Sequence, residues 1–283
     1  MKADGLARGK GVIVCSTVEE SDAAVNAMLV ESRFGRSGAT IVVEERLEGP
    51  ELSLLAVTDG TEVVPLAPAR DYKRAHDGDE GPNTGGMGAY SPPVGVDDAL
   101  VREVVDTVLR PAVRELAGSG DEFRGVLYAG LMMTKAGLRT IEFNARFGDP
   151  EAQVVLPRLR TDFVALALSA ARGTLAGFPD LSWKEQPCVG VVVASGNYPD
   201  DAAVQTGFQV RGLAEMPPGV LIFHAGTRFE PGKGLVTDGG RVVTSVALGD
   251  TVAEARDKAL AGARQVRFHG AFFRSDIAEE GIL

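Results

Sequence analysis

Runs of mostly apolar residues on both sides of short, glycine-containing turns predict two β-hairpins in the first part of the chain. Residues 52–57 and 63–66 flank an Asp59-Gly60 pair, which is a common hairpin turn. Residues 126–134 and 138–143 flank a second turn that ends at Gly137.

Helical spacing and capping residues predict four helices. Residues 17–20 and 251–254 each read Thr-x-x-Glu, the capping-box pattern, and are expected to begin helices that reach about Leu29 and Val266. Apolar residues recur at helical spacing over residues 96–117, where Pro111 is expected to bend the helix. Thr161 is expected to cap a short helix over residues 162–172.

The pattern changes near Gln186, beyond which three buried strands are expected at residues 189–194, 220–224 and 242–248. Few charged or glycine-rich clusters occur there, which indicates a chiefly structural α+β domain. The expected division is therefore residues 1–48, residues 49–185 and a small C-terminal domain at residues 186–283.

The composition of the chain argues against several classes of protein and site. The formal net charge of −10 argues against a nucleic-acid-binding surface, although a local basic pocket could still hold a phosphorylated ligand. Two cysteines make no disulfide framework, and three scattered histidines have no zinc spacing. Residue patterns show no signal peptide and no membrane span, so a cytoplasmic location without a membrane partner is expected.

The strand at residues 138–143 leads into a candidate metal site. Glu142 and Asn144 are two residues apart and should point to the same face, where two oxygen donors suit Mg²⁺. Arg146 could reach the same place and stabilise charge on a phosphoryl group. The alternative is an ordinary strand end, with a solvated Glu142 and a capping Asn144.

Three further segments could meet a nucleotide or a substrate. Residues 4–11 contain three glycines and Lys10, which suits a loop over phosphates, although the P-loop spacing is absent and a surface turn is the alternative. Residues 12–15 and 41–47 are expected as strands, with Glu51 a candidate for ribose. In the polar stretch at residues 70–90, expected as a long loop, charged side chains and backbone amides could hold substrate or be merely solvated.

Three motifs in order, at residues 2–11, 82–92 and 141–151, together resemble the phosphoribosylamine–glycine ligase (glycinamide ribonucleotide synthetase) family of ATP-grasp enzymes. The resemblance extends over nearly the whole chain. It implies an α+β, ATP-grasp fold, with two α+β lobes and nucleotide between them, followed by a small C-terminal α+β domain. The implied reaction joins glycine to 5-phosphoribosylamine through glycyl phosphate, using ATP, in purine biosynthesis.

The resemblance also assigns residues. ATP would be held by Lys2, Gly5, Gly9, Lys10, Gly11, Glu44, Glu45, Leu47 and Glu51. Metal, either Mg²⁺ or Mn²⁺, would be held by Glu142 and Asn144, while Arg146 and Lys10 would act on the phosphoryl group. Substrate would be lined by Asp71, Lys73, Asn83, Thr84, Gly85 and Gly86.

Two departures from the family pattern leave an alternative open. Family members begin with a further domain on the order of a hundred residues, so the resemblance implies an N-terminally truncated or split ligase, acting alone or with a separately encoded N-terminal domain. The strand paired with Glu142 also lacks a further carboxylate. The alternative is thus a catalytically incomplete ATP-binding fragment or subunit.

Overall fold

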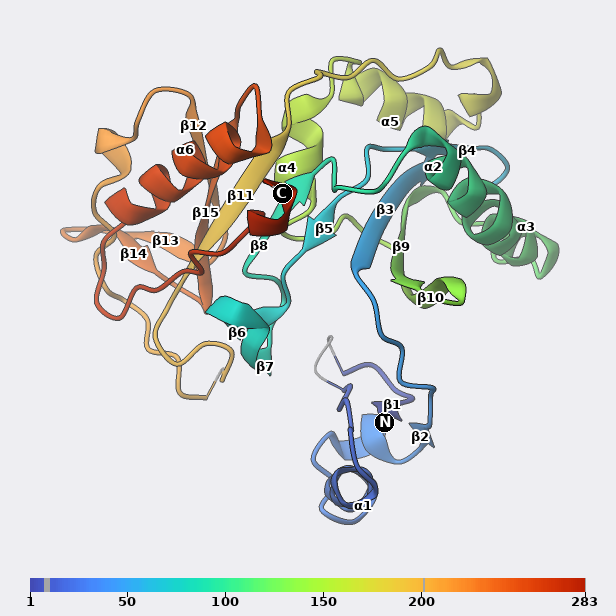
Figure 1. Ribbon diagram of the computed structural model, residues 1–283, viewed down its shortest axis with the longest axis horizontal. Helices are drawn as coiled ribbons and strands as arrows, with labels where there is room; N and C mark the ends of the chain where they lie inside the picture. Colours follow the sequence, from blue (N-terminus) through green and yellow to red (C-terminus); the bar gives the residue numbers. More distant parts are fainter. Residues whose placement is uncertain (8–10, 201, 283) are drawn as a thin grey trace. The chain divides into compact units, whose positions relative to one another are not determined.

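The computed structural model describes residues 1–7, 11–200 and 202–282, which fall into two compact units, Met1–Gly49 and Pro50–Leu283. Both units contain helices and strands, in an α+β arrangement (Figure 1). Each unit is described by itself below.

The first unit pairs two short strands beside one helix. Strands β1 (Lys2–Ala3) and β2 (Ile41–Val42) are antiparallel, and α1 (Val18–Val25) continues into the π-helical η1 (Asn26–Val30). A 3-10 helix, η2 (Gly35–Gly38), follows. Thr17 caps α1 as predicted, because its Oγ1 accepts from the Glu20 amide at 3.2 Å.

The strands expected at residues 12–15 and 41–47 are largely absent from the described first unit. Val12 makes only an isolated bridge to Lys2, and β2 ends at Val42. Val42 and Val43 are 40% and 69% exposed. A unit of this size buries few side chains. The apolar residues at 12–15 and 41–47 therefore gain too little from burial to form the expected strands.

The second unit contains a four-stranded antiparallel sheet that confirms both predicted hairpins. Its order is β10-β9-β3-β4. Its strands are β3 (Glu51–Thr58), β4 (Val63–Pro65), β9 (Gly125–Thr134) and β10 (Gly137–Asn144).

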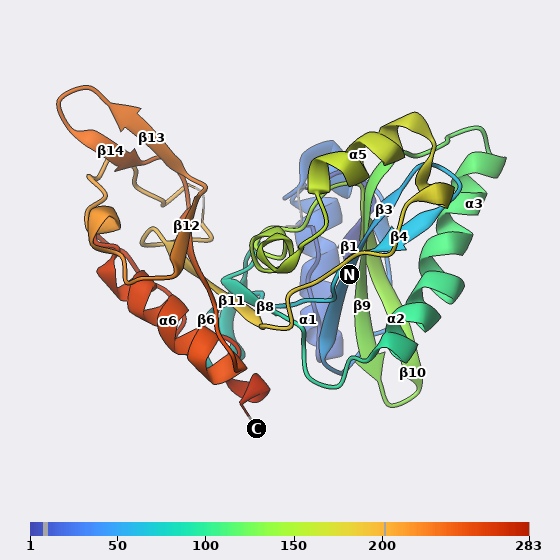
Figure 2. The same cartoon turned by 90° about the horizontal axis from the view of Figure 1, so that it is seen from above.

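Helices pack on both faces of this sheet (Figure 2). The run of α2 (Asp98–Val104), η4 (Val105–Leu109) and α3 (Arg110–Gly118) covers the face that carries Leu52, Leu54 and Ala56. Helix α5 (Phe163–Arg172) covers the face that carries Leu55 and Val57. The alternation along β3 therefore divides its side chains between two cores.

Two helix details differ from the sequence predictions. The irregularity near Pro111 is the π-helical segment η4, directly before α3, in which Pro111 occupies the first turn. The cap of α5 is Asp162 and not Thr161, because Asp162 Oδ1 accepts from the amides of Val164 and Ala165 at 2.8 and 3.2 Å. A carboxylate at this position satisfies two amides that the helix leaves free.

A second, five-stranded antiparallel sheet has the order β12-β15-β11-β8-β5. Its strands are β5 (Arg70–Asp71), β8 (Gly88–Ser91), β11 (Cys188–Ala194), β12 (Val220–His224) and β15 (Arg241–Leu248). Helix α6 (Val252–Gln265), capped by Thr251 as predicted, covers one face (Figure 1).

The long loop expected at residues 70–90 is instead partly strand. β5 and β8 enter the five-stranded sheet, and β6 (Arg74–His76) pairs with β7 (Glu80–Asn83) across the 3-10 helix η3 (Asp77–Asp79). Gly88 permits this, because a Cβ there would lie 2.6 Å from Gly190 O. Strands from residues 49–185 and 186–283 thus share a sheet, and the division at 186 stays a prediction.

The remaining short elements connect these layers. They are α4 (Ala152–Val155), η5 (Leu156–Arg158), η6 (Leu175–Gly177), η7 (Leu213–Glu215), β13 (Thr227–Glu230), β14 (Gly234–Thr237) and η8 (Glu279–Gly281). Within the described residues, every helix is too short or too polar to pass through a bilayer.

Candidate active site

Strand register places the predicted metal ligands on one face of the four-stranded sheet. Glu142 pairs with Gly130, which pairs with Ser53 on the next strand. Asn144 pairs in the same way with Tyr128. Paired residues of antiparallel strands point to the same face, so these five side-chain positions face one region.

A β-bulge sets this orientation. Thr140 pairs with Leu131, but Glu142 pairs with Gly130, so the register shifts between them. Leu131 faces the core beneath α2 and α3, whereas Gly130 faces the opposite side. The bulge therefore turns Glu142 toward the face that carries Ser53, a role that bulges often have beside functional sites.

Glu142, Asn144 and Arg146 lie together at the end of β10. Asn144 Nδ2 donates to Glu142 Oε1 at 3.2 Å, and Arg146 donates to Asn144 Oδ1 at 3.4 Å. Arg146 also donates to its neighbour Phe147 O at 2.7 Å. Rotating the Asn144 amide would place its oxygen beside the Glu142 carboxylate, since amide O and N are assigned from hydrogen bonding alone.

This donor pair fits a hard cation such as Mg²⁺, which takes one or two protein oxygens and completes its sphere with water and phosphate. In the described part of the chain, no group of three or more Asp, Glu, His or Cys side chains could hold a metal. Gly130 leaves room beside Glu142, because a Cβ there would lie 3.3 Å from Glu142 Cγ. The site therefore offers few protein ligands, and Gly130 lets the Glu142 side chain lie close to β9.

A second cluster surrounds Lys73 near the start of β3. Its Nζ lies 2.5 Å from Glu51 Oε2 and 3.9 Å from Asp71 Oδ1. The Asp71 side chain is 4% exposed, and its Oδ1 has no hydrogen-bond partner among the described residues. The structure thus brings together Glu51, predicted for ribose, and Asp71 and Lys73, predicted for substrate.

Burial and neighbouring charges set the protonation of this cluster. Burial raises the pKa of Asp71 to about 7, against the pull of Lys73 and with the push of Glu151 and Glu51. Burial lowers the pKa of Lys73, but Asp71 and Glu51 outweigh it and hold the pKa above its ordinary value. Lys73 therefore stays charged, and Asp71 is poised to titrate near neutral pH.

Sequence reasoning missed a buried carboxylate that adjoins this cluster. Glu151 is 2% exposed; its Oε1 accepts from Tyr128 Oη at 2.6 Å and from Ser53 Oγ at 3.2 Å. Burial, with the charge of Glu151, raises the pKa of Tyr128, so the phenol stays a donor. Glu151 and Tyr128 lie within the family-like stretches, but no sequence signal showed that they would be buried together.

In residues 83–88, here called the substrate loop, the backbone amides of residues 84–87 all have hydrogen-bond partners inside the protein. The amides of Thr84 and Met87 donate to Lys73 O and Tyr72 O, both at 2.7 Å. Those of Gly85 and Gly86 donate to Tyr198 Oη and to Thr84 Oγ1, both at 2.9 Å. These four amides are therefore engaged within the protein, and the assignment of Asn83, Thr84, Gly85 and Gly86 to the substrate stays a prediction.

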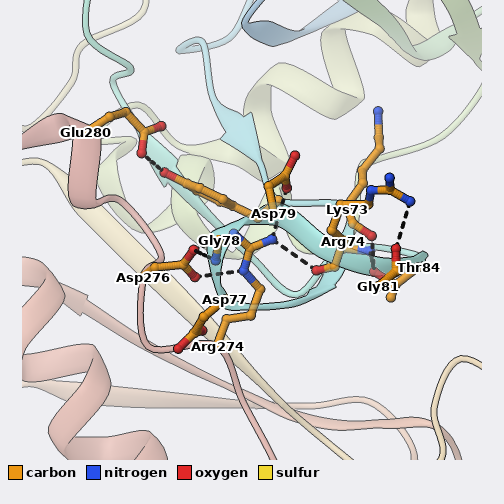
Figure 3. A network of polar contacts seen from close by, with 12 residues as sticks. Lys73, Arg74, Asp77, Gly78, Asp79, Gly81, Thr84, Arg274, Asp276 and Glu280 are labelled. Atoms are coloured by element: carbon orange, nitrogen blue, oxygen red, sulfur yellow. Dashed lines mark hydrogen bonds and ion pairs between the residues drawn. The ribbon is translucent and has the colours of Figure 1, made fainter. Parts of the chain in front are cut away.

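The segment that precedes the substrate loop is anchored by a buried arginine (Figure 3). Arg274 donates to both oxygens of Asp276, at 2.8 and 2.7 Å, to Asp79 Oδ1 at 3.2 Å and to Arg74 O at 3.0 Å. Its guanidinium lies 5.1 Å from the centre of the Tyr72 ring. Lys73, between Tyr72 and Arg74, projects away from the Arg274 network. The network therefore holds the backbone on both sides of Lys73.

A cavity of about 400 Å³ adjoins Arg274, and none of the residues predicted to bind substrate or metal lines it. It is lined by Tyr72, Gly78, Asp79, Arg274, Asp276, Glu279 and Glu280. Glu280 accepts hydrogen bonds from Tyr72 Oη and Arg70. These contacts join the end of the chain to the strand that bears Asp71.

Predicted nucleotide residues of the first unit lie on its two strands and their flanks. Lys2 Nζ is 3.7 Å from Glu44 Oε1, while Glu45 is exposed and Leu47 half-buried. Gly5 packs on η2, since a Cβ there would lie 2.6 Å from Ser37 Cα. Gly11 likewise packs on Ala7. The predictions for Gly9 and Lys10 lie outside the described residues.

Comparison with known proteins agrees with this architecture. The model of the phosphoribosylglycinamide synthetase ATP-grasp (A) domain matches residues 1–152, and that of the phosphoribosylglycinamide synthetase C domain matches residues 188–280. Phosphoribosylamine–glycine ligases of Halalkalibacterium halodurans and Streptomyces coelicolor are 47% and 50% identical to the chain, over 100% and 98% of it. The chain spans 64% and 65% of those two proteins.

Solved structures support the same family and fold. The crystal structure of phosphoribosylamine–glycine ligase from Thermotoga maritima is 36% identical, with a TM-score of 0.84 over 97% of this chain and 67% of that one. The biotin carboxylase domain of 2-oxoglutarate carboxylase from Hydrogenobacter thermophilus, solved with MgADP, has a TM-score of 0.69 over 96% of this chain and 57% of that one, at 15% identity, and so shares the fold alone. The chain therefore has the ATP-grasp fold and belongs to the phosphoribosylglycinamide synthetase family.

Proposed function

We propose that the chain carries the catalytic face of an ATP-dependent ligase that joins glycine to 5-phosphoribosylamine in purine biosynthesis. The observation that supports this most directly is the shared face of Glu142, Asn144 and Ser53, flanked by the Glu51–Lys73 pair. The names of the relatives supply the two substrates. A cytoplasmic location stays a prediction.

The reaction needs no protein nucleophile. A carboxylate oxygen of glycine attacks the γ-phosphorus of ATP, ADP leaves, and glycyl phosphate forms. The amine of phosphoribosylamine then attacks the glycyl carbonyl carbon, phosphate leaves, and the amine loses a proton. Alignment of the reactants and neutralisation of charge can supply most of the acceleration in such a sequence.

The described residues suit these tasks. Glu142 and Asn144 would hold Mg²⁺ or Mn²⁺, which would neutralise charge on the phosphates. Arg146, exposed beside Asn144, would contact the transferring phosphoryl group. Lys73 would contact the carboxylate or the acyl phosphate, since it is cationic and held by Glu51.

The predicted nucleotide residues Lys2, Gly5, Gly11, Glu44, Glu45 and Leu47 stay proposals, as do the three predicted segments 1–48, 49–185 and 186–283. The chain spans 64 to 66% of the length of the curated relatives it matches. The second candidate function is an ATP-binding fragment or subunit that is catalytically incomplete without a separate N-terminal domain.

ADP release in the presence and absence of each reactant tests the proposal. The expected result is ADP formation only when glycine, phosphoribosylamine, ATP and Mg²⁺ are all present. Thermal stabilisation by Mg·ATP, which follows RT ln(1 + [L]/Kd), is measured on the same sample. Stabilisation without glycine-dependent ADP would favour the second candidate, and neither response would contradict both.

A further inference from the structure

Arg241, the first residue of β15, joins two predicted parts of the active site. Its Nη1 donates to Gly85 O at 2.8 Å and to Asp149 O at 2.7 Å. Its Nη2 donates to Asp149 Oδ2 at 3.1 Å. Gly85 belongs to the substrate loop, and Asp149 lies in residues 142–151, here called the metal segment, so one guanidinium holds both.

Tyr198 completes this attachment. Its hydroxyl accepts from the Gly85 amide at 2.9 Å, while the Gly85 carbonyl accepts from Arg241. Both backbone polar groups of Gly85 are thus bound by side chains of residues 186–283. The Tyr198 ring packs on Gly240, where any Cβ would overlap it. Residues 186–283 therefore contact the substrate loop directly, in addition to supporting the fold.

The glycines of the substrate loop fit this arrangement. A Cβ at Gly85 would lie 2.9 Å from Arg241 Nη2, and a Cβ at Gly86 would overlap Pro150 Cδ. Gly86 also has φ of +111°, a conformation that other residues rarely adopt. The two glycines therefore let the loop approach both Arg241 and the metal segment closely.

We propose that Arg241 is a positioning residue that sets where the substrate loop lies relative to the metal segment. Among the described residues, Arg241 makes no hydrogen bond or ion pair with Glu142 or Asn144, so it acts through the backbone that it holds. The inference deepens the proposed ligase function and rests on it for its kinetic consequence. Its structural consequence, restraint of the loop, stands without it.

The geometry requires arginine in particular. A planar guanidinium can donate in one plane to two carbonyls and a carboxylate, whereas a lysine ammonium is a compact point donor. Arg241→Lys should therefore keep the charge and lose part of the restraint. Arg241→Ala should lose all of it.

The matched control is Arg228→Ala. Arg228 lies on β13, in the same part of the chain, and pairs with Asp238 at 3.0 Å and Glu230 at 3.2 Å. It has no contact with the substrate loop among the described residues. A general loss of surface ion pairs would affect both variants equally.

The kinetic arm compares KM values. Arg241→Ala should raise the KM for glycine and for the amine by up to roughly tenfold, since the free energy of the lost charge-assisted hydrogen bonds limits the cost of displacing the loop. The KM for ATP should change by less than about twofold, and Arg241→Lys should be intermediate. An unchanged glycine KM, or an equal rise for ATP, would overturn the proposal.

The second arm is amide hydrogen exchange of residues 84–87, which needs no turnover. Arg241→Ala should speed exchange at these amides, and Tyr198→Phe should speed it chiefly at Gly85, while Arg228→Ala leaves it unchanged. Unchanged exchange in Arg241→Ala would overturn the restraint itself. If the wild-type chain shows no glycine-dependent turnover but this exchange pattern holds, the ligase function fails and the positioning role of Arg241 stands.

Discussion

Lys73 Nζ and Glu51 Oε2 lie 2.5 Å apart, and Asp71 Oδ1 lies 3.9 Å from the same nitrogen. One cation therefore offsets two carboxylates at the edge of the proposed active site. Asp71 is nearly inaccessible, while Lys73 and Glu51 are about one third exposed. The cluster therefore carries an excess of negative charge only at pH values where Asp71, whose pKa burial raises to about 7, is ionised.

Removal of Lys73 should destabilise the ligand-free protein. Lys73→Met leaves Glu51 and Asp71 without their partner, and we expect the free energy of unfolding to fall by roughly 1–3 kcal/mol, after allowance for partial exposure. Urea denaturation measures this change. Lys135→Met, in the exposed turn before β10, is the control. Equal unfolding midpoints for the two variants would show that the pair is not structural.

The metal pair should govern the response to divalent cations. The double variant Glu142→Gln, Asn144→Ala removes the carboxylate charge of Glu142 and the amide oxygen of Asn144. The Kd for Mg·ATP should therefore rise by at least about tenfold. The measurement is the Mg²⁺-dependent shift in melting temperature with ATP present. Glu115→Gln, an exposed carboxylate on α3, should behave as wild type. A normal shift in the double variant would remove Glu142 and Asn144 from the metal site.

The raised pKa of Asp71 predicts a stability that falls with rising pH. Between about pH 4 and pH 7 the folded state keeps a proton on Asp71 that the unfolded state releases, so unfolding becomes easier as pH rises through this window. Above about pH 7 the contribution is constant. Asp71→Asn lacks the effect, so its stability relative to wild type should rise from pH 4.5 to pH 7.5 in denaturant titrations. A pH-independent difference would contradict the burial of an ionisable Asp71.

Gly86 should tolerate no side chain. Gly86→Ala combines strain at φ of +111° with overlap of Pro150, and we expect a loss of roughly 2–4 kcal/mol in unfolding free energy. Gly95→Ala, at φ of +78° with open space around it, should lose only about 1 kcal/mol. Equal losses would mean that the contact between the substrate loop and Pro150 does not constrain the fold.

Features with local causes could be predicted from the sequence. The two hairpins follow from apolar runs on both sides of turns at Gly60 and Gly137, and the caps at Thr17 and Thr251 follow from short-range hydrogen bonds. Glu142 and Asn144 point together for the same reason, because they are two positions apart on one strand. Motif order identified the family.

Features with long-range causes could not be predicted. Residues 70–90 look like a polar loop until β11 supplies a partner for β8. Glu151 becomes buried only when Tyr128 and Ser53 meet it, and Arg241 reaches Gly85 across more than a hundred residues of chain. Secondary-structure propensity and residue spacing do not predict such contacts between distant residues, since tertiary packing decides them.

The most direct test of the proposed ligase chemistry follows an oxygen atom. Glycine labelled with ¹⁸O in its carboxylate is incubated with the protein, phosphoribosylamine and Mg·ATP, and the released phosphate is examined by mass spectrometry. Attack of the carboxylate on the γ-phosphorus predicts one ¹⁸O atom in each phosphate released. Glycine-dependent phosphate that carries no ¹⁸O would contradict a glycyl phosphate intermediate, and with it the central claim about this site.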